Sequence, residues 1–406
     1  MKKNIIVSPG LLSGNVVAPP SKSAAHRAIL CAAMGEGTSI IRHIAFSQDI
    51  EATISAVRAL GAEVTNDENA LMIKGVSPHT LQGEKIFCNE SGSTIRFIIP
   101  IALAMGGAFS VSGAGRLMQR PLEDYFRICD EKHICYQNNE HEISFQGKLT
   151  AGDYYLSGNV SSQYISGLLL SLPLLPGNSR IHITTPVESV GYLEMTLDMM
   201  KRFGVTIKAS EDYREYEISG NQTYKAQDIK MEGDYSQAAF YLVANALGSD
   251  IFVQGLEQDS KQGDREIVKL IQSMQSLDDV RVVDVSQVPD LVPILSVLAA
   301  KSGGVTKIVG AARLRLKESD RLHAVATELS KLGVEIKEQE DSLEIQGNCT
   351  FSGGVVDSHN DHRIAMSLAI AATVASGDVV ICGADSVRKS YTDFWEKFSE
   401  LGGKIS

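Results

Sequence analysis

Residues 329–347 read LSKLGVEIKEQEDSLEIQG, and this pattern recurs along the chain. It returns at 57–75 as VRALGAEVTNDENALMIKG and at 200–220 as MKRFGVTIKASEDYREYEISG. In each copy a helix end is followed by a glycine, a β-rich run, a polar turn, a second run and a closing glycine. The glycines of a pair are 14, 16 and 14 positions apart in Gly61/Gly75, Gly204/Gly220 and Gly333/Gly347. We therefore predict a repeated unit in which a helix leads into a β-hairpin.

Weaker copies extend the repeat. EKHICYQNNEHEISFQG ends at Gly147, MQSLDDVRVVDV at 274–285 is interpreted as a degenerate copy, and SELGGKIS at 399–406 as one cut short. This gives about six units, roughly 70 residues apart, each of which must pack on its neighbours. A chain of 406 residues suggests two domains, hence three units in each. The segment NIIVSP would complete the last unit, so we predict one domain at 14–225 and a second at 1–13 and 226–406.

Composition and charge narrow the classes of function. The chain is 44% hydrophobic and 21% charged, as is ordinary for a soluble globular protein. Its net charge of -11 argues against nucleic acid or an anionic membrane as the main partner, because those partners are bound by Lys and Arg. A small anion remains possible if cations are gathered locally.

Cysteines, histidines and the first residues bear on compartment and metals. The six cysteines include no CxxC pair, which favours free thiols in a reducing compartment. His359 and His362 lack the acids or thiols that would complete a ligand set, so we expect no metal site. The start MKKNIIVSPG is not a signal peptide, and the longest apolar runs are too short to span a bilayer. We expect a cytoplasmic protein.

The segment AARLRLKESDRL at 311–322 concentrates positive charge. Arg313, Arg315 and Lys317 alternate with leucines, which predicts a strand with one cationic face. Like charges on one face repel, so an anion is expected there. Neutralisation by Glu318 and Asp320 is the alternative.

Other segments place Ser, Lys or Arg where an apolar helix begins. Backbone N–H groups and the positive end of the helix dipole make such a terminus suitable for an anion. Ordinary N-capping by Ser or Asp is the alternative reading. The segments are PSKSAAHRAIL with Lys22 and Arg27, SGSTIR with Gly92 and Arg96, SSQYISG with Ser161, Ser162 and Gln163, and NDHRIAM with Asp361 and Arg363.

Two acids stand among these cations. Asp290 opens a long apolar segment, where capping is an equal alternative, and Glu318 lies between Lys317 and Arg321. Neighbouring cations keep a carboxylate ionised and able to accept a proton. No GxSxG motif and no Cys beside a His indicates a nucleophile. The pattern favours proton transfer on a charged substrate.

Taken together, nine segments between residues 19 and 395 resemble the 3-phosphoshikimate 1-carboxyvinyltransferase (EPSP synthase) family. The resemblance implies an α/β (α+β) fold of two similar domains, each with three βαβαββ units around buried helices, and an active site in the interdomain cleft. The segments are PSKSAAHRAIL, SGSTIR, QRPLED, SSQYISGLLL, EGDYSQAAF, VPD, LRLKESDR, NDHRIAM and RKSYTDFW.

The resemblance also implies a reaction. The enolpyruvyl group of phosphoenolpyruvate moves to the 5-hydroxyl of shikimate 3-phosphate and phosphate is released, with no metal or organic cofactor. Asp290 would take the hydroxyl proton, Glu318 would handle the proton at the methylene carbon, and Lys22 would act at the reacting centre. The residues implied for shikimate 3-phosphate are Lys22, Ser23, Arg27, Ser161, Ser162, Gln163, Ser189, Tyr192, Asp290 and Lys317. Those implied for phosphoenolpyruvate are Lys22, Gly92, Arg96, Arg120, Gln163, Arg321, Arg363 and Lys389. We expect a monomer.

The chain departs from the family pattern in places. Asn89-Glu90-Ser91-Gly92-Ser93 stands where Gly-Asn-Ala-Gly-Thr is usual, so Glu90 adds a negative charge near the expected phosphoenolpyruvate site. Phe97 replaces Pro or Leu, and His26 and Gln48 are smaller deviations. These changes bear on phosphoenolpyruvate affinity and glyphosate sensitivity and leave the reaction class unaffected.

Two rival functions share parts of this sequence pattern. UDP-N-acetylglucosamine 1-carboxyvinyltransferase shares the fold and chemistry, but that family usually has Lys-Asn at Lys22-Ser23 and a cysteine in the loop matching GAGRLMQRPLED, which here has none. A noncatalytic anion-binding protein of the same fold would be expected to lose its acids, yet Asp290 and Glu318 are both present.

Overall fold

The computed structural model describes residues 3–67, 70–76, 79–274 and 279–406. These residues form two compact units, Pro20–Glu232 (the N-terminal unit) and Met1–Pro19 with Gly233–Ser406 (the C-terminal unit). The chain therefore passes between the units after residues 19 and 232, where the repeat pattern predicts passages after 13 and 225.

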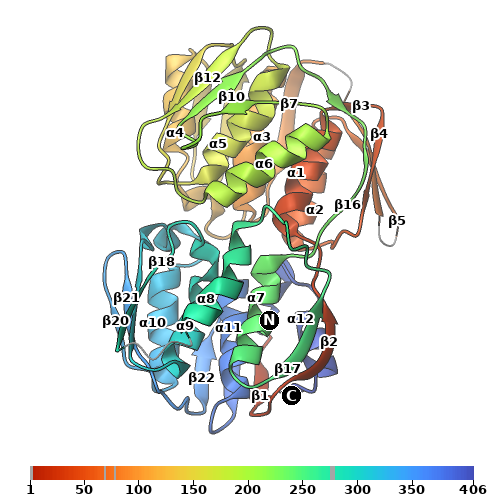
Figure 1. The fold of residues 1–406 in the computed structure, drawn as a ribbon. Coiled ribbons are helices and arrows are strands. Elements are labelled where there is room, and N and C mark those ends of the chain that lie inside the picture. The colour runs from red at the N-terminus through yellow and green to blue at the C-terminus, as the bar shows by residue number, and fades with distance from the viewer. Residues whose placement is uncertain (1–2, 68–69, 77–78, 275–278) are drawn as a thin grey trace. The chain divides into compact units, whose positions relative to one another are not determined.

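The N-terminal unit contains three four-stranded sheets, each built from two parallel strands and an antiparallel hairpin. In two of them a helix joins the parallel strands, whereas β4 and β16 come from the two ends of the unit's sequence. Their strand orders are β16-β4-β6-β5, β7-β8-β10-β9 and β11-β12-β14-β13. Figure 1 labels β4, β5 and β16 of the first sheet, β7 and β10 of the second and β12 of the third. The strands of these sheets are β4 (Thr38–Arg42), β5 (Glu63–Asp67), β6 (Ala70–Lys74), β7 (Leu81–Phe87), β8 (Gly107–Ser112), β9 (Cys135–Asn138), β10 (Glu142–Gly147), β11 (Asp153–Leu156), β12 (Ser179–Ile183), β13 (Lys208–Ala209), β14 (Glu215–Ile218) and β16 (Asp228–Lys230). The helices are α1 (Lys22–Ala33), α2 (Gln48–Ala59), α3 (Gly92–Met105), α4 (Glu123–Glu131), α5 (Ser162–Ser171) and α6 (Val190–Arg202).

The C-terminal unit has two such sheets, β18-β19-β21-β20 and β22-β23-β1-β24, and the parallel pair β2–β17. The chain's first strand, β1, pairs antiparallel with β23 and β24, at the position where the truncated last copy of the repeat lacks a strand. The strands are β1 (Ile5–Ser8), β2 (Ser13–Val17), β17 (Asp250–Gln254), β18 (Val280–Asp284), β19 (Val305–Val309), β20 (Ile336–Glu338), β21 (Leu343–Gln346), β22 (Gly354–Asp357), β23 (Val379–Cys382) and β24 (Lys404–Ile405). The helices are α7 (Tyr235–Ala246), α8 (Ile267–Met274), α9 (Val292–Lys301), α10 (Arg321–Lys331), α11 (His362–Thr373) and α12 (Phe394–Glu400).

The repeated glycines have two distinct structural roles. Gly61, Gly204 and Gly333 follow the ends of α2, α6 and α10 with φ of 98°, 83° and 90°, a left-handed conformation that favours glycine. At the closing position, a Cβ on Gly75 or Gly347 would overlap the backbone carbonyl oxygen of Gly35 or Ser302. The spacing is therefore fixed by one turn and one close backbone approach in each copy.

The two units each contain three inner helices. Almost every residue of α1, α3 and α5 is buried, and so is nearly every residue of α7, α9 and α11. The other long helices, such as α4 and α8, bury only one side. Near-continuous apolar sequence matches this inner position, because a helix buried all round has no polar face. Polar side chains at the first turn of an inner helix are thus the exception that requires a reason.

Two sequence predictions are corrected. Residues 312–316 form a short 3-10 helix, and Arg313 in it is buried while Leu316 is 43% exposed, so the predicted strand with a cationic face does not exist. The described part of the segment 274–285 ends α8 and forms β18, which opens the next sheet parallel to β19; it is no hairpin copy. Its residues 275–278 lie outside the described part of the chain.

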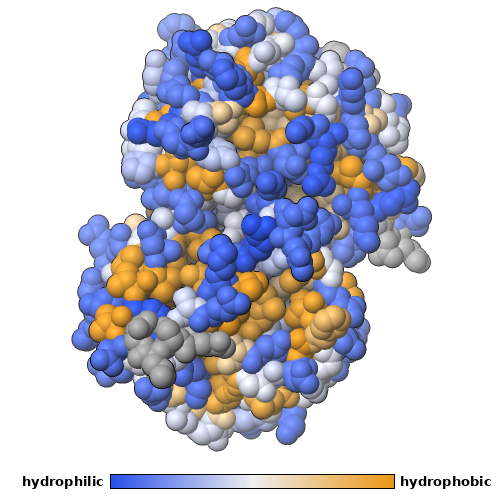
Figure 2. All heavy atoms as spheres, in the orientation of Figure 1, coloured by the Kyte–Doolittle hydropathy of each residue, from blue (hydrophilic) through white to orange (hydrophobic). Residues whose placement is uncertain are grey.

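The outer faces of the sheets carry scattered apolar side chains. Phe252, Val282 and Val355 are 64%, 64% and 61% exposed, on β17, β18 and β22. Figure 2 shows apolar areas over both units, interspersed with hydrophilic ones. Such scattered exposure is normal for a folded protein. Within the described residues, no helix has both the length and the apolar character needed to cross a membrane.

Candidate active site

In the N-terminal unit the three inner helices begin with serine N-caps. The hydroxyl oxygens of Ser21, Ser91 and Ser161 accept hydrogen bonds from backbone N–H groups at the starts of α1, α3 and α5. Each cap is worth about 1 kcal/mol to its helix. The three serines are therefore N-caps, and a capping bond does not prevent the same hydroxyl group from contacting a ligand.

Lys22, the first residue of α1, forms an ion pair. Its Nζ lies 2.6 Å from Oδ2 of Asp49, in the first turn of α2, and the two side chains are 16% and 13% exposed. Partial burial makes this pair stronger than a surface salt bridge, and it fixes the lysine ammonium at one position.

Arg27 lies one turn further into α1 and is buried. Its Nε donates to Thr196 Oγ1 at 2.6 Å, while its Nη1 and Nη2 donate to the backbone oxygens of Ser23 and Tyr192 at 2.8 and 3.0 Å. Its guanidinium carbon lies 5.2 Å from the centroid of the Phe97 ring. Burial lowers the pKa of Arg27 to about 10. Phe97 is one of the departures from the family pattern, and this contact means that the departure changes the surroundings of Arg27.

Arg96 joins α3 to α5. Its Nη1 donates to Gln163 Oε1 at 2.9 Å, and Gln163 Nε2 donates to Ser93 Oγ at 2.9 Å. Its Nη2 donates to the backbone oxygen of Pro121 at 3.1 Å, and the Tyr164 ring lies beneath the guanidinium, 5.3 Å away. Both of these acceptors are neutral, so among the residues that the structure describes no ion pair cancels the charge of this arginine.

Gly92 opens α3 beside Arg120. A Cβ at this position would overlap the guanidinium group of Arg120, so only glycine leaves that arginine where it is. Glu90, the departure noted above, packs its carboxyl group against Gly115, where an added Cβ would lie 2.7 Å from Glu90 Cδ. Of the remaining predicted residues, Ser162 and Ser189 are buried at the starts of α5 and α6, and Ser189 has a left-handed φ of 58°.

In the C-terminal unit Asp290 is the centre of a charged cluster. Its carboxylate lies 2.8 Å from Arg321 Nη1, 3.0 Å from Arg363 Nη2 and 3.3 Å from Lys317 Nζ. The residue lies in the turn before α9, and α9 is capped at Leu291, so the N-cap alternative for Asp290 is wrong. Cations from two separate parts of the sequence, residues 317–321 and residue 363, thus contact the carboxylate of Asp290.

Arg321 is the most buried member of this cluster, with 2% of its side chain exposed. It contacts three acids: Glu318 Oε2 at 2.7 Å, Asp361 Oδ2 at 2.7 Å and Asp290. Burial opposes the charge, but Asp361, Glu318 and Asp290 together raise the pKa of Arg321 well above its usual value. The arginine stays charged and holds the three carboxylates in place.

Two further groups beside Asp290 have shifted pKa values. Burial lowers the pKa of Lys317 to about 8, although Asp290 partly restores it. Burial and the charge of Asp290 raise the pKa of Asp264 to about 6, and Ser236 donates a short hydrogen bond to its carboxylate. Groups that titrate near neutral pH beside a charged carboxylate suit acid–base chemistry.

Lys389 is buried in the C-terminal unit, and its Nζ donates to the backbone oxygen of Asn360 at 2.6 Å. Arg315 is part of the surface, paired with Asp320 and Glu338 at 2.9 and 2.7 Å. The neutralisation alternative is thus correct for Arg315 as far as Asp320 is concerned, while Glu318 pairs with Arg321 instead.

Sequence reasoning missed Asp49 and Asp264, and it treated Asp361 only as an N-cap. Asp361 does cap α11, accepting from Arg363 N at 2.9 Å, and it also binds Arg321. Asp49 gave a signal as an acid in a first helical turn, but that signal equally fits the helix dipole. No grouping of three or more His, Cys, Asp or Glu suited to a metal occurs within the described ranges.

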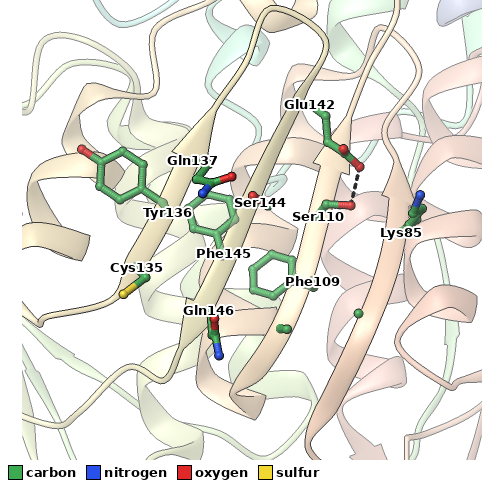
Figure 3. A pocket seen from close by; sticks show the side chains of 12 residues that line it. Lys85, Phe109, Ser110, Cys135, Tyr136, Gln137, Glu142, Ser144, Phe145 and Gln146 are labelled. Atoms are coloured by element: carbon green, nitrogen blue, oxygen red, sulfur yellow. Dashed lines mark hydrogen bonds between the residues drawn. The ribbon is translucent and has the colours of Figure 1, made fainter.

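An open hollow lies elsewhere, on the sheet β7-β8-β10-β9. Figure 3 shows Ser110 on β8 donating to Glu142 on β10, and this hydrogen bond measures 2.6 Å. The hollow holds about 430 Å³ and is lined by Lys85, Tyr136, Gln137 and their neighbours. None of its lining residues is a predicted site residue, so it is separate from the clusters described above.

Comparisons with known proteins identify the family of the chain. A family model described as EPSP synthase (3-phosphoshikimate 1-carboxyvinyltransferase) matches residues 6–398. Curated relatives named 3-phosphoshikimate 1-carboxyvinyltransferase from Clostridium perfringens and Clostridium kluyveri are 47% and 46% identical, over 99% of this chain and 99% and 98% of theirs. A solved EPSP synthase structure from Acinetobacter baumannii has a TM-score of 0.81 at 25% identity, covering 99% of both chains. The chain belongs to the EPSP synthase family.

Proposed function

We propose that this protein transfers the enolpyruvyl group of phosphoenolpyruvate to the 5-hydroxyl of shikimate 3-phosphate, releasing phosphate. The single observation that carries the proposal is the cluster in which Asp290 and Glu318 are both bonded to the buried Arg321. A binding protein needs cations for two anionic ligands, whereas this cluster adds ionised carboxylates that can accept protons. The names of the relatives supply the identity of the substrates.

The proposed reaction is an addition followed by an elimination. The 5-hydroxyl oxygen bonds to C2 of phosphoenolpyruvate and its proton passes to Asp290, while Glu318, which has taken up a proton from solvent before the addition, gives that proton to C3 and becomes a carboxylate again. The tetrahedral intermediate then loses a proton from C3, again to Glu318, and the C2–O bond to phosphate breaks. Phosphate leaves with the electrons of that bond, and the enol ether is formed. Positioned acids and bases of this kind contribute about 10²–10⁴-fold each.

Each unit has a proposed share of the binding. In the N-terminal unit, Lys22 would act at the reacting centre and Arg96, Gly92 and Arg120 would bind the carboxylate and phosphate of phosphoenolpyruvate. The arrangement of Arg96 supports this, since neutral partners leave its charge uncompensated. The residues proposed for shikimate 3-phosphate there are Lys22, Ser23, Arg27, Ser161, Ser162, Gln163, Ser189 and Tyr192.

In the C-terminal unit, Asp290 and Lys317 would contact the ring of shikimate 3-phosphate, and Arg321, Arg363 and Lys389 would bind phosphoenolpyruvate. The partly lowered pKa of Lys317 supports a role in proton transfer near Asp290. We further propose that the enzyme works as a cytoplasmic monomer without a metal or organic cofactor. Light scattering after size exclusion tests the monomer, since a mass of 43.9 kDa is expected.

The test is release of phosphate from phosphoenolpyruvate with two acceptors in parallel. Shikimate 3-phosphate should support turnover, and UDP-N-acetylglucosamine should give only the background rate. Turnover with the nucleotide sugar alone would assign the chain to the sister reaction. Binding of phosphoenolpyruvate without turnover on either acceptor would indicate an anion-binding protein. Chelator-treated enzyme run alongside tests the expectation that no metal is required.

A further inference from the structure

Glu328 is a buried acid on α10 with no place in the proposed chemistry. It is 1% exposed, and both of its oxygens are bonded. Lys331 Nζ lies 2.9 and 2.8 Å from Oε1 and Oε2, His359 Nε2 lies 2.7 Å from Oε1, and the backbone N–H of Asp357 donates to Oε2 at 2.9 Å. A carboxylate buried so completely has to be paired, and two of these partners lie on one turn, residues 357–360.

This turn has an uncommon backbone. His359 and Asn360 have φ of 52° and 56°, two successive left-handed residues without a glycine. Local bonds support it: His359 N donates to Asp357 Oδ1 at 2.6 Å, and Ser358 Oγ donates to the backbone oxygen of Gly383 at 2.9 Å. A conformation of this kind persists only when its surroundings hold it.

Helix α10 is bonded both to this turn and to Asp361, the N-cap residue of α11 that follows it. Arg321 and Glu328 are seven positions apart, two turns, and so lie on one face of the helix. Arg321 Nε donates to Asp361 just after the turn, and Glu328 accepts from Asp357 and His359 within it. Between these two attachments the backbone oxygen of Asn360 accepts from Lys389 Nζ.

We propose that Glu328 and His359 are positioning residues that fix the turn 357–360 so that Asn360 aims the Lys389 ammonium at phosphoenolpyruvate. The inference rests on the proposed function, in which Lys389 binds that substrate. Neither Glu328 nor His359 touches a reacting atom in this arrangement. Loosening the turn should therefore weaken phosphoenolpyruvate binding while leaving shikimate 3-phosphate binding and the chemical step nearly unchanged.

Protonation of His359 should make the arrangement depend on pH. The hydrogen bond and charge of Glu328 raise the pKa of His359, Asp357 adds to this, and burial and Lys331 oppose it. Burial raises the pKa of Glu328, but the bonds from His359 and Lys331 outweigh it and keep the pKa below its usual value. The charged pair is intact below the raised pKa of His359 and weakens as pH increases through it, above about 6.5. The KM for phosphoenolpyruvate should rise over that range.

The test compares His359→Asn with Lys331→Gln. Both remove one partner of Glu328, but only His359 lies on the turn, and Asn tolerates its left-handed backbone while being too short to reach Glu328. For His359→Asn we expect the KM for phosphoenolpyruvate to rise about three- to tenfold, with kcat and the other KM changed less than about twofold. The pH-dependent rise in KM should vanish in this variant. Lys331→Gln should keep it, moved to higher pH because Lys331 no longer lowers the pKa of His359.

Three results would overturn the inference: an unchanged KM for phosphoenolpyruvate in His359→Asn, an equal rise in KM for both substrates, or a pH dependence that survives the substitution. An equal rise would assign the turn a purely structural role. Failure of the proposed function shows separately, because the unsubstituted protein would then release no phosphate from phosphoenolpyruvate and shikimate 3-phosphate before any variant is compared. Melting temperatures of both variants measure any loss of fold.

Discussion

Two pairs of buried arginines, Arg27 and Arg96 in the N-terminal unit and Arg321 and Arg363 in the C-terminal unit, are hydrogen-bonded in different ways. In the N-terminal unit Arg27 and Arg96 donate to hydroxyl, amide and backbone oxygens, all of them neutral. In the C-terminal unit Arg321 donates to three carboxylates and Arg363 shares one of them. Both solutions give most of the guanidinium nitrogens a hydrogen-bond acceptor, although Nε of Arg96 has none among the described residues. They differ in the charge that is left for a ligand.

Neutral acceptors orient an arginine without cancelling its charge, so an incoming anion meets the full attraction. Carboxylate acceptors cancel much of the charge, but the acids themselves are then kept ionised and fixed in position. We therefore propose that Arg27 and Arg96 serve anion binding, whereas the Arg321 cluster serves in addition to hold carboxylates for proton transfer. Lys22, paired with Asp49, departs from the neutral pattern of Arg27 and Arg96, and it is also the residue expected at the reacting centre.

The largest expected effect is on the proton-transfer side. Glu318→Gln removes the carboxylate charge but keeps an oxygen that can accept from Arg321, so both substrates should still bind. We expect kcat to fall by about 10²–10⁴-fold because proton transfer at the methylene carbon is lost. Phosphate release gives the rate and calorimetry the binding. Glu338→Gln, which removes an acid from the surface pair with Arg315, is the control and should stay near the unsubstituted rate. Near-normal turnover in Glu318→Gln would remove this acid from the mechanism.

The same comparison predicts a large effect on stability. Arg321→Ala would leave Glu318, Asp290 and above all the fully buried Asp361 without their shared partner. The free energy of unfolding should drop by about 3–5 kcal/mol, since uncompensated buried charge is costly. Urea unfolding measures the change. Arg315→Ala, on the same segment but paired at the surface, should cost about 1 kcal/mol or less. Equal losses in the two variants would mean that Arg321 is not the centre of a buried network.

How far the sequence could lead is visible in these residues. Glycine spacing predicted the hairpins after α2, α6 and α10, because turn conformation and close backbone approach are local requirements. The alternation of Arg and Leu at 313–317 predicted a strand, and that prediction was wrong because the same residues also fit a 3-10 helix that buries Arg313. Partners such as Asp49 for Lys22 or Glu328 for His359 lie 27 and 31 positions away, and only the packed fold brings them together.

A smaller effect is expected on the anion-binding side. Arg96→Ala removes a cation with neutral partners, so stability should fall by only about 1 kcal/mol. The KM for phosphoenolpyruvate should rise roughly 10–100-fold, as for the loss of a charge-assisted contact to a bound anion. The KM for shikimate 3-phosphate should change much less. Arg58→Ala is a matched control in the same unit, since Arg58 also donates to a backbone oxygen, that of Val64. Equal weakening of both substrates in Arg96→Ala would contradict the assignment.

The smallest expected effect concerns Lys317. It tests whether burial or the neighbouring carboxylates determine the pKa of a lysine in the C-terminal cluster. Its pKa in the folded protein is about 8, below the ordinary value of 10.5, because burial outweighs Asp290 and Glu318. Below pH 8 the free-energy cost of burying the ammonium is fully present in the folded protein. Between pH 8 and 10.5 the unfolded chain binds more protons than the folded one, so the free energy of unfolding increases as pH rises. The side chain is 25% exposed, which limits this increase to about 1 kcal/mol.

The measurement is urea unfolding of the natural chain and of Lys317→Met at about pH 7 and about pH 9.5. The free energy of unfolding of the natural chain should increase relative to that of the variant between the two pH values. A difference independent of pH would mean that Asp290 offsets the burial, and that the cluster holds its lysine charged throughout.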